Sequence, residues 1–237
     1  MQCRLPPNYS LHQSAVGAGF ALLLAVLLGS CVATDLSAQV IVAPNALATN
    51  DGNTSQTSPI GGPTFVREMQ VFDASQFGDL SGPSFLTRFV WRPDAMPGPS
   101  GPRTVTLKIF ASTTSRAANG LSTTFAENLG ADNTLVFNGT LNWVTENLPG
   151  PGNTRQFDVV FPFMTPFRYD PAAGNLLLDM QFSGNGSAIR FDAVSDNPTA
   201  GKVLNTSSSN ATTGVVGVPE VMQFTFQPQL LDRKSVV

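Results

Sequence analysis

The feature that most constrains the fold is a series of short segments in which apolar residues alternate with polar ones. Near the C-terminus, for example, Phe224 and Phe226 alternate with Gln223, Thr225 and Gln227. Successive side chains of a β-strand point to opposite faces, so this alternation predicts a strand with one face on a core and one in solvent.

Eight segments follow this pattern, with residues rich in Gly, Pro and Asn between them. Their apolar sets are Phe65, Met69, Val71; Phe85, Phe89, Trp91; Val105, Leu107, Ile109; Leu135, Phe137, Leu141, Trp143; Phe157, Val159, Phe161, Phe163; Leu176, Leu178, Met180, Phe182; Ile189, Phe191, Ala193; and Met222, Phe224, Phe226. We therefore expect an all-β protein, an antiparallel two-sheet sandwich of jelly-roll type with about 8–10 strands. At most one short helix is expected, within residues 121–129.

Residues 1–38 are predicted to be a signal peptide. Arg4 precedes an apolar run over residues 16–28, which has the length of a signal core and is short for a membrane span. Small residues at two sites allow cleavage after Ala33 or Ala38. We favour Ala38, and the mature chain is then exported to the cell surface or the extracellular space.

A competing interpretation of the same region is a lipoprotein signal. Residues 28–31 read Leu-Gly-Ser-Cys and resemble a lipobox. In bacterial lipoproteins the cysteine of this motif is lipidated and becomes the new N-terminus. Cys31 would then anchor the protein to a membrane, and the sequence leaves both forms of export open.

The mature chain is expected to contain neither cysteine nor histidine. Cys3, Cys31 and His12 all lie in the leader, and they are the only residues of these two types. Their removal excludes catalysis by Ser-His-Asp or Cys-His groups and any metal site that contains histidine. The sequence therefore argues against an enzyme.

Three further segments follow the leader. Residues 39–63 are rich in Asn, Thr, Gly and Pro and are predicted to be a flexible arm, and residues 64–231 form the sandwich domain. Residues 232–237, Asp-Arg-Lys-Ser-Val-Val, are what a common sequencing-adapter oligonucleotide encodes, and we interpret them as adapter read-through. We exclude these six residues from the expected fold.

The charge pattern limits the partners. The formal net charge is −3, and no run or stripe of Lys and Arg is present. Nucleic acid is therefore not expected as a partner. Extracellular polysaccharide or envelope components are the expected partners, and no transmembrane segment is expected in the mature chain.

Aromatic residues are candidates for a sugar-binding platform, because sugars stack on exposed rings. Trp91 and Trp143 share the apolar face of their strands, so a core position is favoured for both. Tyr169 lies in a turn-like stretch and is expected to be the most exposed of the three rings.

Four aspartates are candidates for a calcium site. Asp170 and Asp179 flank a predicted turn, and Asp192 and Asp196 flank the end of a strand. Loop carboxylates and carbonyls bind Ca²⁺ in many secreted proteins, but the chain lacks Asp-x-Asp-x-Asp spacing. Aspartate in a turn usually caps its own backbone, so a structural role is favoured and no other cofactor is expected.

Several stretches together carry a family resemblance. They are residues 71–77 (Val-Phe-Asp-Ala-Ser-Gln-Phe), residues 109–114 (Ile-Phe-Ala-Ser-Thr-Thr), residues 167–179 and the strand at residues 222–226. The chain resembles uncharacterised secreted β-sandwich proteins of environmental bacteria, many of which end in a PEP-CTERM sorting tail. That tail begins Val-Pro-Glu-Pro, whereas here Val221 follows Glu220, so the tail itself is not present. The resemblance implies export and a surface role without a known activity.

The leading hypothesis is an exported, non-catalytic structural or adhesive module of the cell surface or extracellular matrix. The first alternative is a carbohydrate-binding module, with calcium as an optional ligand. The second is a histidine-free glycoside hydrolase, which requires two facing carboxylates in a cleft. Burial of Trp91, Trp143 and Tyr169 is the observation that would weaken the sugar-binding alternative.

Overall fold

In a computed structural model of the chain, residues 37–57, 65–94, 100–185 and 189–229 are described, and all of them belong to one compact unit. The predicted all-β, antiparallel class is confirmed, with twelve strands and four short 3₁₀ helices in these ranges. The strands are β1 (Gln39–Ala43), β2 (Thr54–Thr57), β3 (Val66–Phe72), β4 (Ser84–Trp91), β5 (Ser100–Thr114), β6 (Thr134–Thr145), β7 (Val159–Tyr169), β8 (Asn175–Asn185), β9 (Arg190–Ala193), β10 (Ala200–Asn205), β11 (Val215–Gly217) and β12 (Met222–Pro228). The helices are η1 (Asn45–Leu47), η2 (Ala74–Phe77), η3 (Ala118–Gly120) and η4 (Phe125–Asn128).

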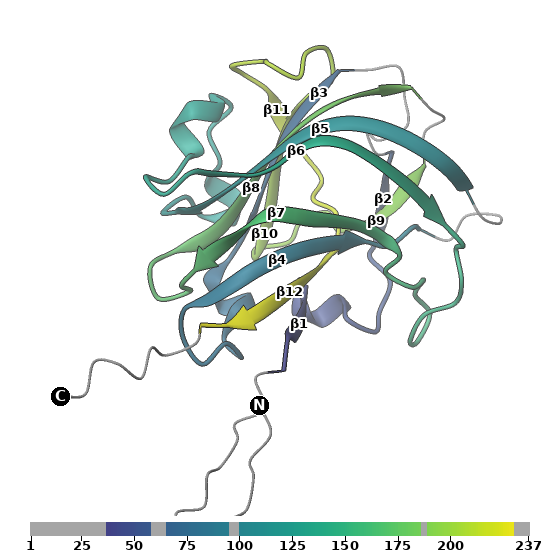
Figure 1. The fold of residues 1–237 in the computed structure, drawn as a ribbon, viewed down its shortest axis with the longest axis horizontal. Coiled ribbons are helices and arrows are strands. Elements are labelled where there is room, and N and C mark those ends of the chain that lie inside the picture. Colours follow the sequence, from purple (N-terminus) through teal and green to yellow (C-terminus); the bar gives the residue numbers. More distant parts are fainter. Residues whose placement is uncertain (1–36, 58–64, 95–99, 186–188, 230–237) are drawn as a thin grey trace, which may run out of the picture. The chain divides into compact units, whose positions relative to one another are not determined.

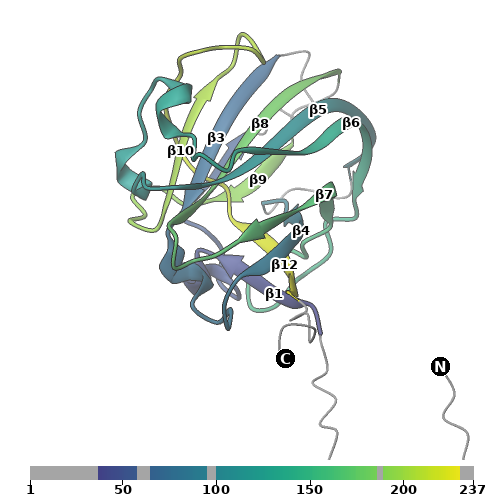
Figure 2. The same ribbon diagram turned by 60° about the vertical axis from the view of Figure 1, so that its left-hand side comes forward.

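The strands form two large sheets and one small one. The four-stranded sheet has the order β1-β12-β4-β7, the six-stranded sheet has the order β11-β10-β3-β8-β5-β6, and β2 pairs with β9. Figures 1 and 2 show the two large sheets as separate layers. Only β5–β6 and β10–β11 are neighbours both in the sequence and in a sheet, so the chain passes repeatedly from one layer to the other.

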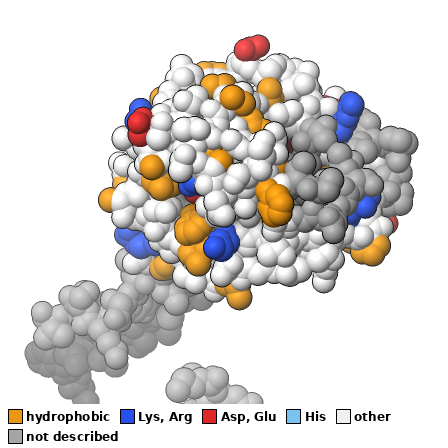
Figure 3. All heavy atoms as spheres, turned by 90° about the horizontal axis from the view of Figure 1, so that it is seen from above, with side chains coloured by type: hydrophobic (Ala, Val, Ile, Leu, Met, Phe, Trp, Pro, Cys, Tyr) orange, Lys and Arg blue, Asp and Glu red, His pale blue; other side chains and the backbone are white. Residues whose placement is uncertain are grey.

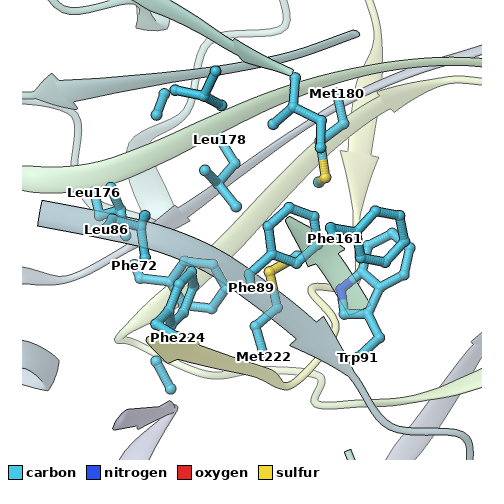
Figure 4. Close-up of a cluster of buried hydrophobic side chains, with 14 of the residues drawn as sticks. Phe72, Leu86, Phe89, Trp91, Phe161, Leu176, Leu178, Met180, Met222 and Phe224 are labelled. Atoms are coloured by element: carbon cyan, nitrogen blue, oxygen red, sulfur yellow. The ribbon is translucent and has the colours of Figure 1, made fainter. Parts of the chain in front are cut away.

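Aromatic side chains fill the space between the two large sheets. Phe72 of β3 contacts Phe224 of β12 edge-on, with ring centroids 5.1 Å apart. The rings of Trp91 of β4 and Phe182 of β8 are tilted to each other, with centroids 6.2 Å apart. Figure 4 shows Trp91 beside Phe161 in the same cluster. Rings from both layers therefore share one core, as expected for a sandwich.

The six-stranded sheet also buries part of its outer face, which the alternation did not predict. Met69 and Val71 of β3 and Leu177 of β8 pack there under Phe125 of η4. Met69 and Val71 are buried as their alternation predicts, but in this outer cluster and not between the two large sheets. The core position predicted for Phe65, from the same set, is wrong, because Phe65 is 56% exposed. The segment that carries η3 and η4 covers this face (Figure 2), so both faces of β3 are buried.

Irregular pairing explains two further differences from simple alternation. The register between β4 and β7 shifts between Leu86 and Arg88, and Leu86 faces the core instead of Phe85. A second shift lies in β5 at its pairing with β6, and there Leu135 is 42% exposed. A bulge adds one residue to one strand and so changes which side chains face inward.

The ordered sheet begins earlier in the chain than predicted. Residues 39–63 were expected to be a flexible arm, but β1 pairs with β12 from Gln39 onward and β2 pairs with β9. The arm prediction is wrong for these strands, and residues 58–63 lie outside the described residues. The single helix expected within residues 121–129 is the short η4. Within the described ranges, no helix has the length and apolar character needed to cross a membrane.

A large-to-small change at Phe161 tests the shared core. Phe161 of β7 is 1% exposed and stacks on Phe89, with centroids 4.6 Å apart. Phe161→Ala should lower the free energy of unfolding by about 3–5 kcal/mol, measured by urea denaturation. Met164→Ala on the same strand is the control, because Met164 is 71% exposed and its loss should change stability by less than about 0.5 kcal/mol. Equal losses for the two variants would contradict this core.

Candidate functional site

The three aromatic residues predicted for sugar binding are all buried. Trp91 and Tyr169 are 0% exposed and Trp143 is 5% exposed. The core position favoured for the two tryptophans is confirmed, but the expected exposure of Tyr169 is wrong, because β7 extends to this residue. The Tyr169 hydroxyl donates to the Gly174 carbonyl at 2.9 Å, and burial raises the pKa of Tyr169. None of these rings presents a face on which a sugar could stack.

The four aspartates predicted for calcium do not converge on one point. Asp179 accepts two hydrogen bonds from Arg67, and Asp170 caps the backbone N–H of Ala172. Asp196 is exposed, with a positive φ of 55°. Across the described ranges, no three His, Cys, Asp or Glu side chains lie close enough together to hold a metal ion. The structure therefore gives the calcium prediction no set of ligands, and Cys31 lies outside the described residues.

Asp192 instead forms a buried ion pair with Arg92. Arg92 Nε donates to Asp192 Oδ2 at 2.6 Å, and both side chains are 0% exposed. Arg92 also donates to the Asn50 carbonyl, and the Gly52 N–H donates to Asp192 Oδ1 at 2.8 Å. Burial raises the pKa of Asp192 although Arg92 opposes the change. The pair joins the loop before β2 to the ends of β4 and β9.

A second buried group of charges lies on the inner face of the six-stranded sheet. Lys202 Nζ donates to Glu220 Oε1 at 2.6 Å and to Glu220 Oε2 at 2.8 Å. Glu68 Oε2 lies 2.8 Å from the same nitrogen. The side chain of Lys202 is 1% exposed and those of both glutamates are 0% exposed. We call Glu68, Gln70, Lys202 and Glu220 the buried lysine cluster.

Strand pairing explains how these residues meet. Lys202 of β10 lies directly opposite Gln70 of β3, and Gln70 in turn lies opposite Leu178 of β8, which is a core residue. Glu68, two residues away on β3, shares this inner face. Glu220 comes from the segment between β11 and β12, so the cluster joins a strand of one sheet to the entrance of a strand of the other.

Gln70 fixes the position of Glu220. Its Nε2 donates to Glu220 Oε2 at 2.5 Å, and its Oε1 accepts the backbone N–H of Glu220 at 3.1 Å. Glu68 Oε2 is paired with Lys202 Nζ, whereas Glu68 Oε1 has no hydrogen-bond partner among the described residues although it is buried. Glu68 therefore faces the lysine as a carboxyl with free hydrogen-bonding capacity.

The cluster holds one more acid than base. Two ionised carboxylates around one ammonium leave an excess negative charge without water, which is unfavourable. Burial accordingly raises the pKa of Glu220 to about 7, opposed by Lys202. Burial alone would lower the pKa of Lys202, but Glu220 and Glu68 outweigh it and raise that pKa. Burial and the second carboxylate therefore both favour the protonated form of a carboxyl in the cluster.

A groove of about 830 Å³ lies beside the cluster. Its ionisable lining residues in the described chain are Asp196 and Lys202, and the others are small, aliphatic or neutral polar. Gly201 forms part of its lining, and a Cβ at this position would lie 1.8 Å from the Ala118 carbonyl oxygen. Glycine is therefore needed where η3 crosses β10. Chemically, the groove offers neutral hydrogen-bonding groups from Asn119, Ser195 and Asn197.

Sequence reasoning missed the buried lysine cluster. Glu68 and Gln70 alternate with apolar residues, a pattern that predicts solvent for their side chains. The outer face of β3 is covered, so the polar set faces the core instead. One signal of burial was available in the sequence. Lys202 and Glu220 each stand next to a valine, an apolar context that is unusual for an exposed charge.

Comparisons with known proteins do not identify a family. No protein-family model matches the sequence, and no curated protein matches it. The chain is weakly similar to solved structures of infectious bursal disease virus. For the Gx strain the TM-score is 0.21 at 14% identity, over 81% of this chain and 36% of the viral chain. For the Gt strain the TM-score is 0.19 at 16% identity, over 98% of this chain and 51% of the viral chain. Similarity at this level carries no argument about function.

Breaking the Arg92–Asp192 pair tests its structural role. Asp192→Asn should destabilise the fold by about 3–5 kcal/mol, because it leaves Arg92 buried and without its counter-ion. The matched control is Glu127→Gln. It removes the negative charge from an exposed ion pair, in which Glu127 Oε2 lies 3.6 Å from Arg116 Nη2. We expect this control to change stability by less than about 1 kcal/mol in the same urea titration. Similar effects of the two variants would show that burial of the Arg92–Asp192 pair is unimportant.

Proposed function

We propose that this protein is an exported, non-catalytic structural or adhesive module of the cell surface or extracellular matrix. The observation that carries the proposal is the use of its buried charges. The buried acids of the described chain are paired inside the fold: Glu68 and Glu220 with Lys202, Asp179 with Arg67, and Asp192 with Arg92. An enzyme would present such ionisable groups to a substrate. In this protein they connect strands and loops instead.

The position of β1 supports export with cleavage after Ala38. Gln39, the first residue after that site, begins β1 and pairs with Phe226 of β12. Cleavage after Ala38 leaves β1 whole, whereas cleavage within residues 39–43 would remove the edge strand of the four-stranded sheet. Cleavage after Ala38 would therefore separate the proposed leader from the ordered domain without removing a strand.

The surface supports contact with weakly charged partners. Figure 3 shows a face on which uncharged groups predominate and charged side chains are scattered. Val215 and Val216 of the edge strand β11 are 65% and 75% exposed. Such a surface offers little electrostatic attraction to polyanions, and extracellular polysaccharide or envelope components remain the partners we propose.

The two alternative functions have less support. A carbohydrate-binding module needs an exposed ring beside polar groups, and Trp91, Trp143 and Tyr169 are buried. A glycoside hydrolase needs two facing carboxylates. Asp196 is the carboxylate that lines the groove within the described chain.

Expression of the full chain, leader included, in a Gram-negative host tests export. With a C-terminal tag, the protein should reach the envelope or medium with Gln39 as its first residue, read by N-terminal sequencing. Leu24→Arg is the control, because a charge in the apolar run should keep the protein inside the cell. Lipidated Cys31 at the N-terminus would instead establish the lipoprotein form. Uncleaved protein in the cytoplasm would contradict export.

The exported protein should bind no defined oligosaccharide on a glycan array, with or without calcium, and should hydrolyse none. Saturable binding would support the carbohydrate-binding module in place of the structural one. Release of reducing sugar would support the hydrolase.

A further inference from the structure

We propose that the buried lysine cluster forms an intramolecular amide bond between Lys202 Nζ and Glu220 Cδ, with Glu68 as the proton-transferring group. The bond would be made by the folded protein itself and would be a covalent link between its two sheets. This inference concerns chemistry within the chain and does not depend on the location of the protein.

The reacting groups are already in contact. Both oxygens of Glu220 lie within 2.8 Å of Lys202 Nζ. These side chains are almost fully excluded from solvent, so water does not compete for the carboxyl group. Holding an amine against a carboxyl in a fixed geometry turns a reaction between two molecules into one within a single molecule and raises its rate strongly.

The proton content of the cluster suits the reaction. Amide formation needs a neutral amine and a carboxylic acid, whereas an isolated lysine and glutamate in water are both charged. In a site without water, moving the proton from the ammonium to a carboxylate yields neutral groups and removes the penalty of burying charge, and this gain opposes the two carboxylates, which favour the ammonium. The second carboxyl, Glu68, lies 2.8 Å from Lys202 Nζ and is placed to take the proton that the ammonium gives up.

The step balances without an added reagent. The Lys202 amine attacks Glu220 Cδ and forms the C–N bond, while the carbonyl electrons move to Oε2. Gln70 Nε2, 2.5 Å from Oε2, donates a hydrogen bond to the negative charge that develops there. Glu68 accepts a proton from the lysine nitrogen and delivers it to Oε1, the Cδ–Oε1 bond breaks, and one water leaves. Glu68 ends in its starting state.

The position of the bond would give it a structural consequence. Lys202 and Pro219, the neighbour of Glu220, both line the groove, so the reacting pair lies close to it. The bond would close residues 202–220 into a ring. It would join β10 of the six-stranded sheet to the segment that leads into β12 of the four-stranded sheet.

A peptide map of the purified full-length protein tests the bond. Trypsin cuts after Lys and Arg, so a chain without the bond gives separate peptides 191–202 and 203–233. An amide at Lys202 blocks the cut, and we expect one peptide, 191–233, lighter than its sequence by the mass of one water. Free peptides 191–202 and 203–233 at their full masses would overturn the proposal. A link from Lys202 to peptide 68–88 would overturn Glu220 as the acceptor.

Variants separate the roles of the cluster residues. Lys202→Met should abolish the mass loss, whereas Lys108→Met, at an exposed lysine of β5, should retain it. Glu68→Gln keeps both bonded residues and should slow formation of the link by about 10²-fold or more, with tryptophan fluorescence as the check that it is folded. A folded Glu68→Gln protein that links as fast as the wild type would overturn the role of Glu68. If Lys202→Met does not fold, the wild-type peptide map still decides the main claim.

Discussion

One buried lysine connects the two layers of this protein. Lys202 projects from β10 of the six-stranded sheet and holds Glu220, which leads into β12 of the four-stranded sheet. Directly after Glu220, the Val221 N–H donates to the Asp192 carbonyl at 2.9 Å. β12 then pairs with β1 on one side and β4 on the other. The position of Glu220 therefore influences three of the four strands in that sheet.

The other buried charges act in the same way at different places. Arg92 and Asp192 hold the loop before β2, and Arg67 and Asp179 lie where the outer face of β3 is covered. Arg67 also lies over the ring of Phe125, 4.6 Å from its centroid, so the charge packs on the second apolar cluster. Charges removed from water are tolerated because each has a close partner. The aromatic core supplies most of the buried apolar surface, while the ion pairs fix how loops and strands meet on it.

Much of the fold was predictable from the sequence, because alternation is a local signal. Residues such as Leu178, Met180 and Phe224 face the core as their spacing predicts. The face of β3 was not predictable in this way, since an outer cluster buries Met69 and leaves Glu68 inside. Tyr169 was misplaced because a turn-like sequence lies at the end of a long strand. The ion pairs Arg67–Asp179 and Arg92–Asp192 join residues 112 and 100 positions apart, a distance at which local patterns carry no information.

A double-mutant cycle over Lys202 and Glu220 tests most directly the claim that these residues act as one structural unit. Lys202→Met should lower the free energy of unfolding by about 3–5 kcal/mol, because it leaves two buried carboxyl groups without their counter-ion. Glu220→Gln should cost less, because Glu68 still pairs with Lys202. The double variant should lose less than the sum, because the Lys202–Glu220 contact is already missing from each single variant, although Glu68 is left without Lys202 in it. Losses that add to within about 0.5 kcal/mol, measured by urea denaturation, would show that the two residues act independently and would contradict the account.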